Sequence, residues 1–313
     1  MNQFDLYTDS SANIPQNLID KYDIGVVSYL CTVNGQERPC YEHGVEFSKT
    51  AKAFYNDMRE GADIKTSLIS CERIIEMIEP SFKQGKDAVM VTISSGISGT
   101  YNQALEAKKT LENKYKGRHL YVCDGANASF GEGLQVLKIA DLRSMGASAK
   151  TCAEWAKENA YKFNSYFTVS DLKYLRKGGR ISTTLAIAGT ILNIKPILRA
   201  NGETPAKISF FGKERGRKKA ISALADAFSE NAVSPEHNTV AIAHADCEED
   251  AETLAAMLRE RGANDVIIEY YDLCSGTHVG PGTLALFFYG KDRRKDVRET
   301  APAVAGQTAS NKI

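Results

Sequence analysis

The hydrophobic positions of the N-terminal half form short β-branched runs that alternate with longer stretches of helical spacing. Strand-like runs occur at Phe4 to Thr8, Ile24 to Val33 and Asp87 to Thr92, and helical periodicity appears between them, for example from Cys71 to Phe82. Strands that alternate with helices of about ten or more residues are typical of a parallel sheet covered by helices. The pattern therefore predicts an N-terminal α/β domain over residues 1–163.

A second α/β domain is predicted for residues 164–290, where strand-like and helical segments again alternate. An apolar helix is expected over Leu185 to Leu192. The next strand-like run, Ile194 to Leu198, contains a proline and is therefore expected at a sheet edge. The polar segment 291–313 has no apolar periodicity and is expected to be a disordered tail.

The stretch Val89 to Ala104, VMVTISSGISGTYNQA, joins an apolar strand to a helix through a turn of Ser, Gly and Thr. Such a turn gathers hydroxyls and unpaired backbone N–H groups at the carboxyl edge of a sheet, which suits an anion. The ordinary alternative is helix capping by Ser98 or Thr100, with Gly99 permitting the bend. This turn by itself leaves both interpretations open.

The composition argues against several classes of partner. Lys plus Arg and Asp plus Glu number 39 each among 313 residues, so no global charge attracts nucleic acid or an acidic membrane. No window approaches the roughly 18–20 apolar residues of a membrane span, and no secretory signal is recognisable. Seven scattered Cys without a C-x-x-C pair argue against disulfides and structural zinc. We expect a cytoplasmic protein without a bound metal, a nucleic-acid partner or stable membrane insertion.

Known enzyme motifs are incomplete in this chain. Gly280-Pro281-Gly282 with Ala285 satisfies G-x-G-x-x-A, but it lacks the long helix and the acidic residue about 20 positions on that a dinucleotide site needs. Gly96-Ile97-Ser98-Gly99 is one residue short of the nucleophile elbow G-x-S-x-G. The five His residues show no metal-ligand spacing. His278, expected in a glycine-rich loop after a strand, remains a candidate partner for a carboxylate.

The chain resembles the DegV family up to about Gly290, because several independent signatures occur in the family's order. They are Tyr7-Thr8-Asp9-Ser10-Ser11, Thr66-Ser67, ISSGISGTY at 93–101, DLKYLRKGGRIS at 171–182, LNIKPIL at 192–198, KERGRKKA at 213–220 and THVGPGTLALFFYG at 277–290. The resemblance implies two α/β domains that hold one long-chain fatty acid in a buried tunnel near their interface. It implies no cofactor besides this lipid, and a separate fatty acid kinase that phosphorylates the presented carboxylate.

The resemblance also implies the residues of the site. The carboxylate would be bound by Thr66, Ser95 and His278, with Arg180 nearby. The neighbouring loop residues would support them: Ser67, Ser94, Gly96 and Ser98. Where the family usually has Thr-Ser-Gln-Pro-Ser, this chain has Leu68 and Ile69 in place of Gln-Pro. This departure leaves open the shape of the loop and the preferred length of the fatty acid.

The residue types agree with a carrier that needs no nucleophile. Hydrogen bonds to a charged acceptor contribute about 1.5–3 kcal/mol each, and each buried CH₂ of a lipid tail about 0.8 kcal/mol. The alternative is a serine hydrolase of acyl esters using Ser95 or Ser98, which the missing elbow and the lack of an Asp partner for His278 disfavour. The basic run Arg215 to Lys219 suits docking of a protein partner better than nucleic acid, since no aromatic residues interleave it.

Overall fold

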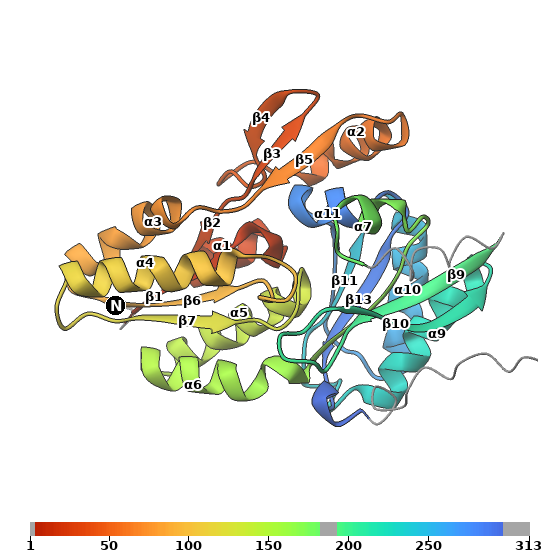
Figure 1. Ribbon diagram of the computed structural model, residues 1–313. Helices are drawn as coiled ribbons and strands as arrows, with labels where there is room; N and C mark the ends of the chain where they lie inside the picture. Colours follow the sequence, from red (N-terminus) through yellow and green to blue (C-terminus); the bar gives the residue numbers. More distant parts are fainter. Residues whose placement is uncertain (1–3, 182–192, 297–313) are drawn as a thin grey trace, which may run out of the picture.

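The computed structural model describes residues 4–181 and 193–296, which form two α/β domains side by side (Figure 1). The first is built on a parallel sheet with the strand order β2-β1-β6-β7. The helix expected over Leu185 to Leu192 lies outside the described residues. The strands of the first sheet are β1 (Phe4–Asp9), β2 (Ile24–Val27), β6 (Asp87–Thr92) and β7 (Leu120–Asp124).

Helices cover both faces of this parallel sheet, which explains the continuous apolar runs of its strands. Leu6, Val89 and Val91 are fully buried between the layers. Helices α3 and α4 lie on one face and α5 and α6 on the other (Figure 1). The predicted parallel, helix-covered sheet is confirmed. The helical elements of this domain are η1 (Ser10–Ala12), α1 (Gln16–Tyr22), α2 (Ser48–Arg59), α3 (Cys71–Lys83), α4 (Thr100–Lys114), α5 (Phe130–Ser144) and α6 (Ala149–Asn159).

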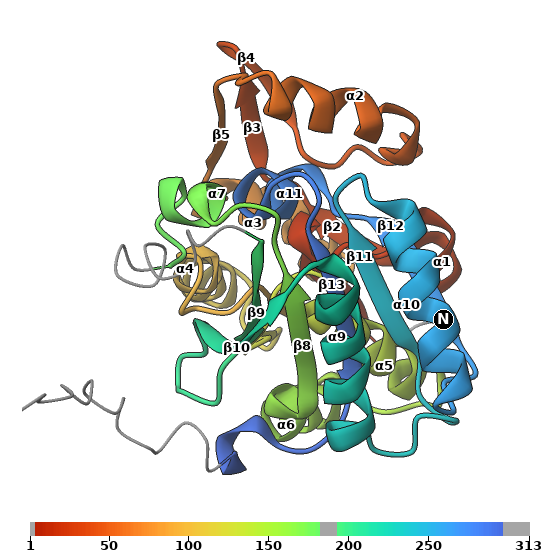
Figure 2. The ribbon, with the colours of Figure 1, turned by 90° about the vertical axis from the view of Figure 1, so that its right-hand side faces the viewer.

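A small antiparallel sheet projects from the first domain over the second (Figures 1 and 2). It consists of β3 (Leu30–Val33), β4 (Gln36–Pro39) and β5 (Ile64–Ser67), with β3 in the centre. Asn34 and Gly35 turn the chain between β3 and β4 with φ of 49° and 85°, as a tight hairpin turn requires. The small sheet packs against α11 (Leu273–Val279) of the second domain.

The second domain contains a six-stranded mixed sheet in the order β10-β9-β8-β13-β11-β12. Tyr166 and Leu286 on one face pack against α9 and α10, whereas Phe167 and Phe287 on the other face join the core shared with the first domain. No helix in the described part of the chain has the length and apolarity needed to cross a bilayer. The elements are η2 (Ala160–Lys162), β8 (Phe163–Thr168), α7 (Lys173–Lys177), β9 (Ile194–Ala200), β10 (Ile208–Arg215), α9 (Arg217–Asn231), β11 (Val240–His244), α10 (Glu248–Glu260), β12 (Val266–Tyr270), α11, β13 (Leu284–Tyr289) and η3 (Arg293–Lys295).

Two local predictions about this domain are wrong. His278 lies in the last turn of α11 and not in a loop, because the Asp272 side chain caps the helix by accepting hydrogen bonds from the N–H groups of Cys274 and Ser275. Strand β9, which contains Pro196, is not at the sheet edge. Its pairing with β8 begins only at Ile197, so Pro196 is flanked by β10 alone.

The prediction of a disordered tail from residue 291 is wrong for residues 291–296. Arg293 in η3 is buried, and its guanidinium donates hydrogen bonds to the carbonyl oxygens of Asn201 at 2.6 Å and Ala126 at 2.7 Å. Ala126 belongs to the first domain and Asn201 to the second. The segment after the last strand therefore ties the two domains together.

The turn after β6 forms another contact between the domains. The Ser94 hydroxyl donates a hydrogen bond to the Ala206 carbonyl oxygen at 2.7 Å, and a Cβ atom at position 96 would lie 2.3 Å from the same oxygen. Only glycine allows this close approach at position 96.

We expect Gly96→Ala to lower the free energy of unfolding by about 1–3 kcal/mol, because the new methyl group must displace a backbone carbonyl. Urea denaturation measures the loss. The matched control is Gly212→Ala, since no atom lies within 4 Å of a Cβ at that position. An equal effect of both substitutions would contradict the tight contact between the turn and Ala206.

Candidate functional site

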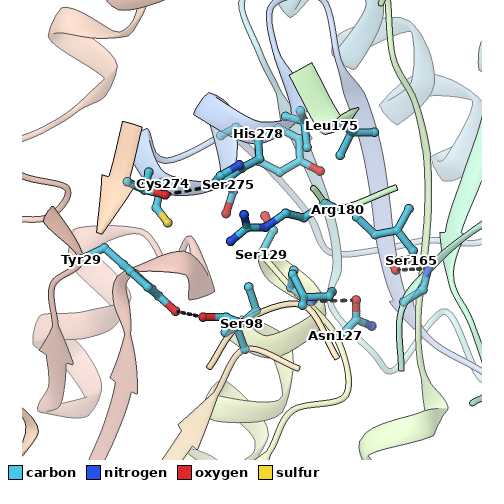
Figure 3. A pocket seen from close by; sticks show the side chains of 18 of the residues that line it. Tyr29, Ser98, Asn127, Ser129, Ser165, Leu175, Arg180, Cys274, Ser275 and His278 are labelled. Atoms are coloured by element: carbon cyan, nitrogen blue, oxygen red, sulfur yellow. Dashed lines mark hydrogen bonds between the residues drawn. The ribbon is translucent and has the colours of Figure 1, made fainter. Parts of the chain in front are cut away.

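A cavity of about 470 Å³ lies where the first domain, the small sheet and the second domain meet (Figure 3). This volume falls within the range of about 300–1,000 Å³ that is usual for small-molecule sites. Much of its wall is apolar, with polar side chains entering from several separate elements. The apolar lining residues include Ile93, Ile97, Phe167, Leu175, Ile208, Val279 and Phe287.

Thr66 and His278, which the family resemblance assigned to one site, are brought together at the cavity wall. The distance between Thr66 Oγ1 and His278 Nε2 is 2.8 Å, although 212 positions separate the residues in the chain. Thr66 comes from β5 and His278 from α11. This hydrogen bond therefore links the small sheet to the second domain beside the cavity.

The His278 imidazole is neutral at pH 7. Burial, followed by the positive charge of Arg180, lowers the pKa of His278 to about 4. The ring lies so close to Gly178 that a Cβ atom at that position would be 2.4 Å from Nδ1. The first glycine of the Gly-Gly-Arg segment therefore leaves room for the imidazole, which acts here as a neutral hydrogen-bonding group.

Arg180 is the one charged side chain among the described residues that line the cavity. Its side chain extends into the cavity between residues of the two domains (Figure 3), and its Nη1 donates a hydrogen bond to the Gly178 carbonyl oxygen. No carboxylate pairs with it in the described part of the chain. A guanidinium without a counter-ion makes the cavity suitable for one anionic group.

Ser95 does not line the cavity, contrary to the role assigned to it from the sequence. Its hydroxyl donates a hydrogen bond of 2.5 Å to Asp124 Oδ2, and its backbone N–H donates another to Asp124 Oδ1 at 3.2 Å. Asp124 ends the neighbouring strand β7 and so holds Ser95 away from the cavity. Ser98 of the same turn lies in the cavity wall and is hydrogen-bonded to Tyr29 and Thr100.

The loop residues predicted to support the site divide into two groups. Ser94 and Gly96 contact Ala206 at the domain interface and do not line the cavity. Ser67 and Ser98 do line it, and Ser67 is exposed at its edge.

The sequence analysis did not identify several polar residues that line the cavity: Tyr29, Asn127, Ser129, Ser165 and Ser275. Burial and the charge of Asp9 raise the pKa of Tyr29 well above its usual value, so its hydroxyl stays protonated and hydrogen-bonds Thr100 Oγ1 at 2.6 Å. Asn127 and Ser129 follow β7 just as the Ser-Gly turn follows β6. The rule that ligands gather at the carboxyl ends of parallel strands would have identified these two residues.

The hydrogen bonds of Ser95 and Ser98 differ from those of an activated serine nucleophile. A serine nucleophile needs a hydrogen-bonded base that a third group orients. Among the described residues, Ser95 and Ser98 form no hydrogen bond to a histidine, and His278 has no carboxylate partner. The described residues also contain no group of three or more His, Cys, Asp or Glu side chains arranged to hold a metal ion.

The low pKa of His278 predicts a specific loss of stability in acid. Below a pH of about 6.5 the unfolded chain binds a proton at this histidine, whereas the folded protein does so only near pH 4, so folding becomes less favourable between these values. Between pH 7 and 4.5, the wild type should lose roughly 2–3 kcal/mol of unfolding free energy relative to His278→Gln. Urea denaturation at several pH values measures the difference. A difference that stays constant with pH would contradict a buried neutral imidazole.

Comparison with known sequences gives consistent matches over nearly the whole chain. A family model described as "Uncharacterised protein, DegV family" matches residues 3–291. A DegV domain-containing protein from Clostridium perfringens is 38% identical over 291 residues, which cover 93% of this chain and 98% of that protein. Protein DegV from Bacillus subtilis is 30% identical over 285 residues, which cover 89% of this chain and 96% of that protein.

Solved structures share the fold. DegV from Bacillus subtilis, described as a fatty acid binding protein, superposes with a TM-score of 0.78 at 27% identity, covering 93% of this chain and 100% of that one. A Thermotoga maritima protein described as revealing a fatty acid binding function gives a TM-score of 0.77 at 28% identity, with coverage of 93% and 100%. The chain, matched by the family model from residue 3 to residue 291, belongs to the DegV family.

Proposed function

We propose that this protein is a carrier that binds one long-chain fatty acid in the cavity, with the carboxylate beside Thr66, His278 and Arg180. The observation that carries the proposal is the Arg180 guanidinium, which has no counter-ion among the described residues and lies in a cavity with largely apolar walls. A single positive charge next to an apolar wall matches an anion with a hydrocarbon tail. Fatty acid binding by proteins of the same family and fold supports the same ligand class.

The head group and the tail contribute in different ways. Charge-assisted hydrogen bonds to the carboxylate provide about 1.5–3 kcal/mol each and fix its position. At about 0.8 kcal/mol per buried CH₂, some fifteen methylenes provide about 12 kcal/mol before the costs of binding. The tail therefore supplies most of the affinity, and the polar residues select a carboxylate.

Leu68 belongs to the cavity wall and also reaches the protein surface. It lines the cavity and is also 51% exposed, and its side chain lies next to Gly99 of the turn after β6. The DegV family usually has Gln at this place. We propose that the larger apolar surface of Leu68 shields the ligand from water and influences which chain lengths are accepted.

We also propose that the protein acts in the cytoplasm and presents the bound carboxylate to a fatty acid kinase. Thr66 is half-buried and its neighbour Ser67 is exposed, so the proposed head-group site lies close to the surface. In the basic run, Arg217 pairs with Asp250 at 2.8 Å and so links the start of α9 to the start of α10. Lys218 and Lys219 are exposed and available to a partner.

Substitutions at the head-group site test the binding function. Thr66→Val and Arg180→Met should each weaken oleate binding about 10-fold or more, because each removes a hydrogen bond to the carboxylate. Ser95→Ala should leave the affinity within about 2-fold, since Asp124 already holds this hydroxyl. Calorimetric titration of delipidated protein measures the affinities.

If the wild type neither carries a fatty acid in mass spectra nor binds oleate, the carrier function is wrong. A loss confined to Ser95→Ala would place the carboxylate elsewhere.

Charge reversal in the basic run tests the docking proposal. Lys218→Glu combined with Lys219→Glu should leave oleate binding intact and lower phosphorylation of the bound fatty acid by a cognate kinase. Phosphorylation rates at saturating fatty acid measure the effect, with reversal of the exposed Lys150 on α6 as the control. Equal loss of binding and phosphorylation would show that the run is structural. Unchanged phosphorylation would exclude these lysines from the docking surface.

A further inference from the structure

The hydroxyl of Ser129 is a buried hydrogen-bonding group that nothing in the described structure satisfies. Ser129 is 1% exposed, lines the cavity, and its Oγ forms no hydrogen bond with any described residue. A buried hydroxyl without a partner costs about 1–3 kcal/mol, and most such groups in folded proteins are paired. The position of Ser129 therefore points to a partner that enters with the ligand.

The Ser129 hydroxyl does not serve as a helix cap, although its position would allow this. Ser129 immediately precedes α5, where serine commonly caps the helix by accepting a backbone hydrogen bond. Here the residue has φ of 53° and ψ of −140°, and its side chain makes no capping bond. This conformation is strained for a residue other than glycine. The N-terminal end of a 15-residue helix lies beside the hydroxyl and makes the surroundings favourable for a ligand oxygen.

Asn127 and Ser165 of the cavity wall are already engaged in hydrogen bonds, whereas the Ser275 Oγ, like that of Ser129, has no partner among the described residues. Asn127 donates from Nδ2 to the Phe163 carbonyl oxygen at 2.7 Å and accepts from the Ala128 N–H at 3.0 Å. Ser165 accepts a hydrogen bond from the Ala200 N–H at 3.3 Å. In Figure 3, Ser129 and His278 lie on opposite sides of the Arg180 side chain. Ser129 is thus separate from the Thr66–His278 pair.

We propose that Ser129 forms a second polar subsite, which binds a hydroxyl group carried on the acyl chain, and that the ligands of this protein include hydroxy fatty acids. The inference rests on the proposed function and adds a ligand class to it. Arg180 is the one cation among the described lining residues, so one carboxylate balances the charge of the cavity and a second polar group has to be neutral. A hydroxyl can both donate to and accept from Ser129 Oγ, which suits an unpaired serine.

Binding of stearic acid and of positional isomers of hydroxystearic acid to the delipidated full-length protein tests the subsite. Wild type, Ser129→Ala, Ser129→Gly and Thr66→Val are compared by calorimetry. Glycine removes the hydroxyl and accommodates φ of 53°, so Ser129→Gly should fold with an unchanged or higher melting temperature. For at least one isomer, removal of the hydroxyl should weaken binding about 3- to 10-fold, while stearic acid binds both Ser129 variants as well as it binds wild type.

The outcomes separate the subsite from the proposed carboxylate site. If stearic acid and every hydroxystearic acid weaken equally in Ser129→Gly, Ser129 binds the carboxylate and the inference is wrong. If no isomer weakens, the subsite does not exist. Thr66→Val should weaken all ligands alike. If it weakens none of them while an isomer still depends on Ser129, the proposed carboxylate site fails and the hydroxyl subsite stands.

Discussion

The cavity exists because the carboxyl edge of the parallel sheet faces the side of the six-stranded sheet that α9 and α10 leave uncovered. The turns after β6 and β7 supply polar groups from one side, and Phe167 and Phe287 supply apolar surface from the other. This geometry depends on a few close contacts, including the approach of Gly96 to the Ala206 carbonyl oxygen. The polar and apolar parts of the cavity wall therefore meet only when both domains are in place. Neither domain contains the cavity alone.

Buried acids lie under the same edge and are held by hydrogen bonds. Asp9 accepts from Ser11 and from the Ile93 N–H, and Glu132 accepts from Thr8. Burial raises the pKa of Asp9 and raises that of Glu132 well above its usual value. These carboxyl groups do not line the cavity that contains Arg180. The Tyr-Thr-Asp-Ser-Ser segment thus belongs to a hydrogen-bond network behind the site.

Much of the fold was predictable, since alternating strands and helices in the N-terminal half indicate a parallel sheet. Thr66 and His278 were predictable as a pair only through ordered family motifs, because 212 positions separate them. The position of Ser95 outside the cavity wall could not be predicted, because its hydrogen-bond partner Asp124 is 29 positions away and belongs to another strand. Ser129 could have been named as a residue that follows the carboxyl end of β7, but the lack of a hydrogen-bond partner for its hydroxyl is visible only in the structure.

The buried contacts of Arg293 concern the order in which the two domains can assemble during synthesis. Its guanidinium bonds Ala126, which is three positions before Ser129, and Asn201 of the second domain. His278 is also supplied late in the chain. N-terminal domains generally fold first as a chain leaves the ribosome, so the parallel sheet can form early. The complete cavity cannot form until β13, which supplies Phe287 to its wall, has left the ribosome, and Arg293 can tie the two domains together only after that.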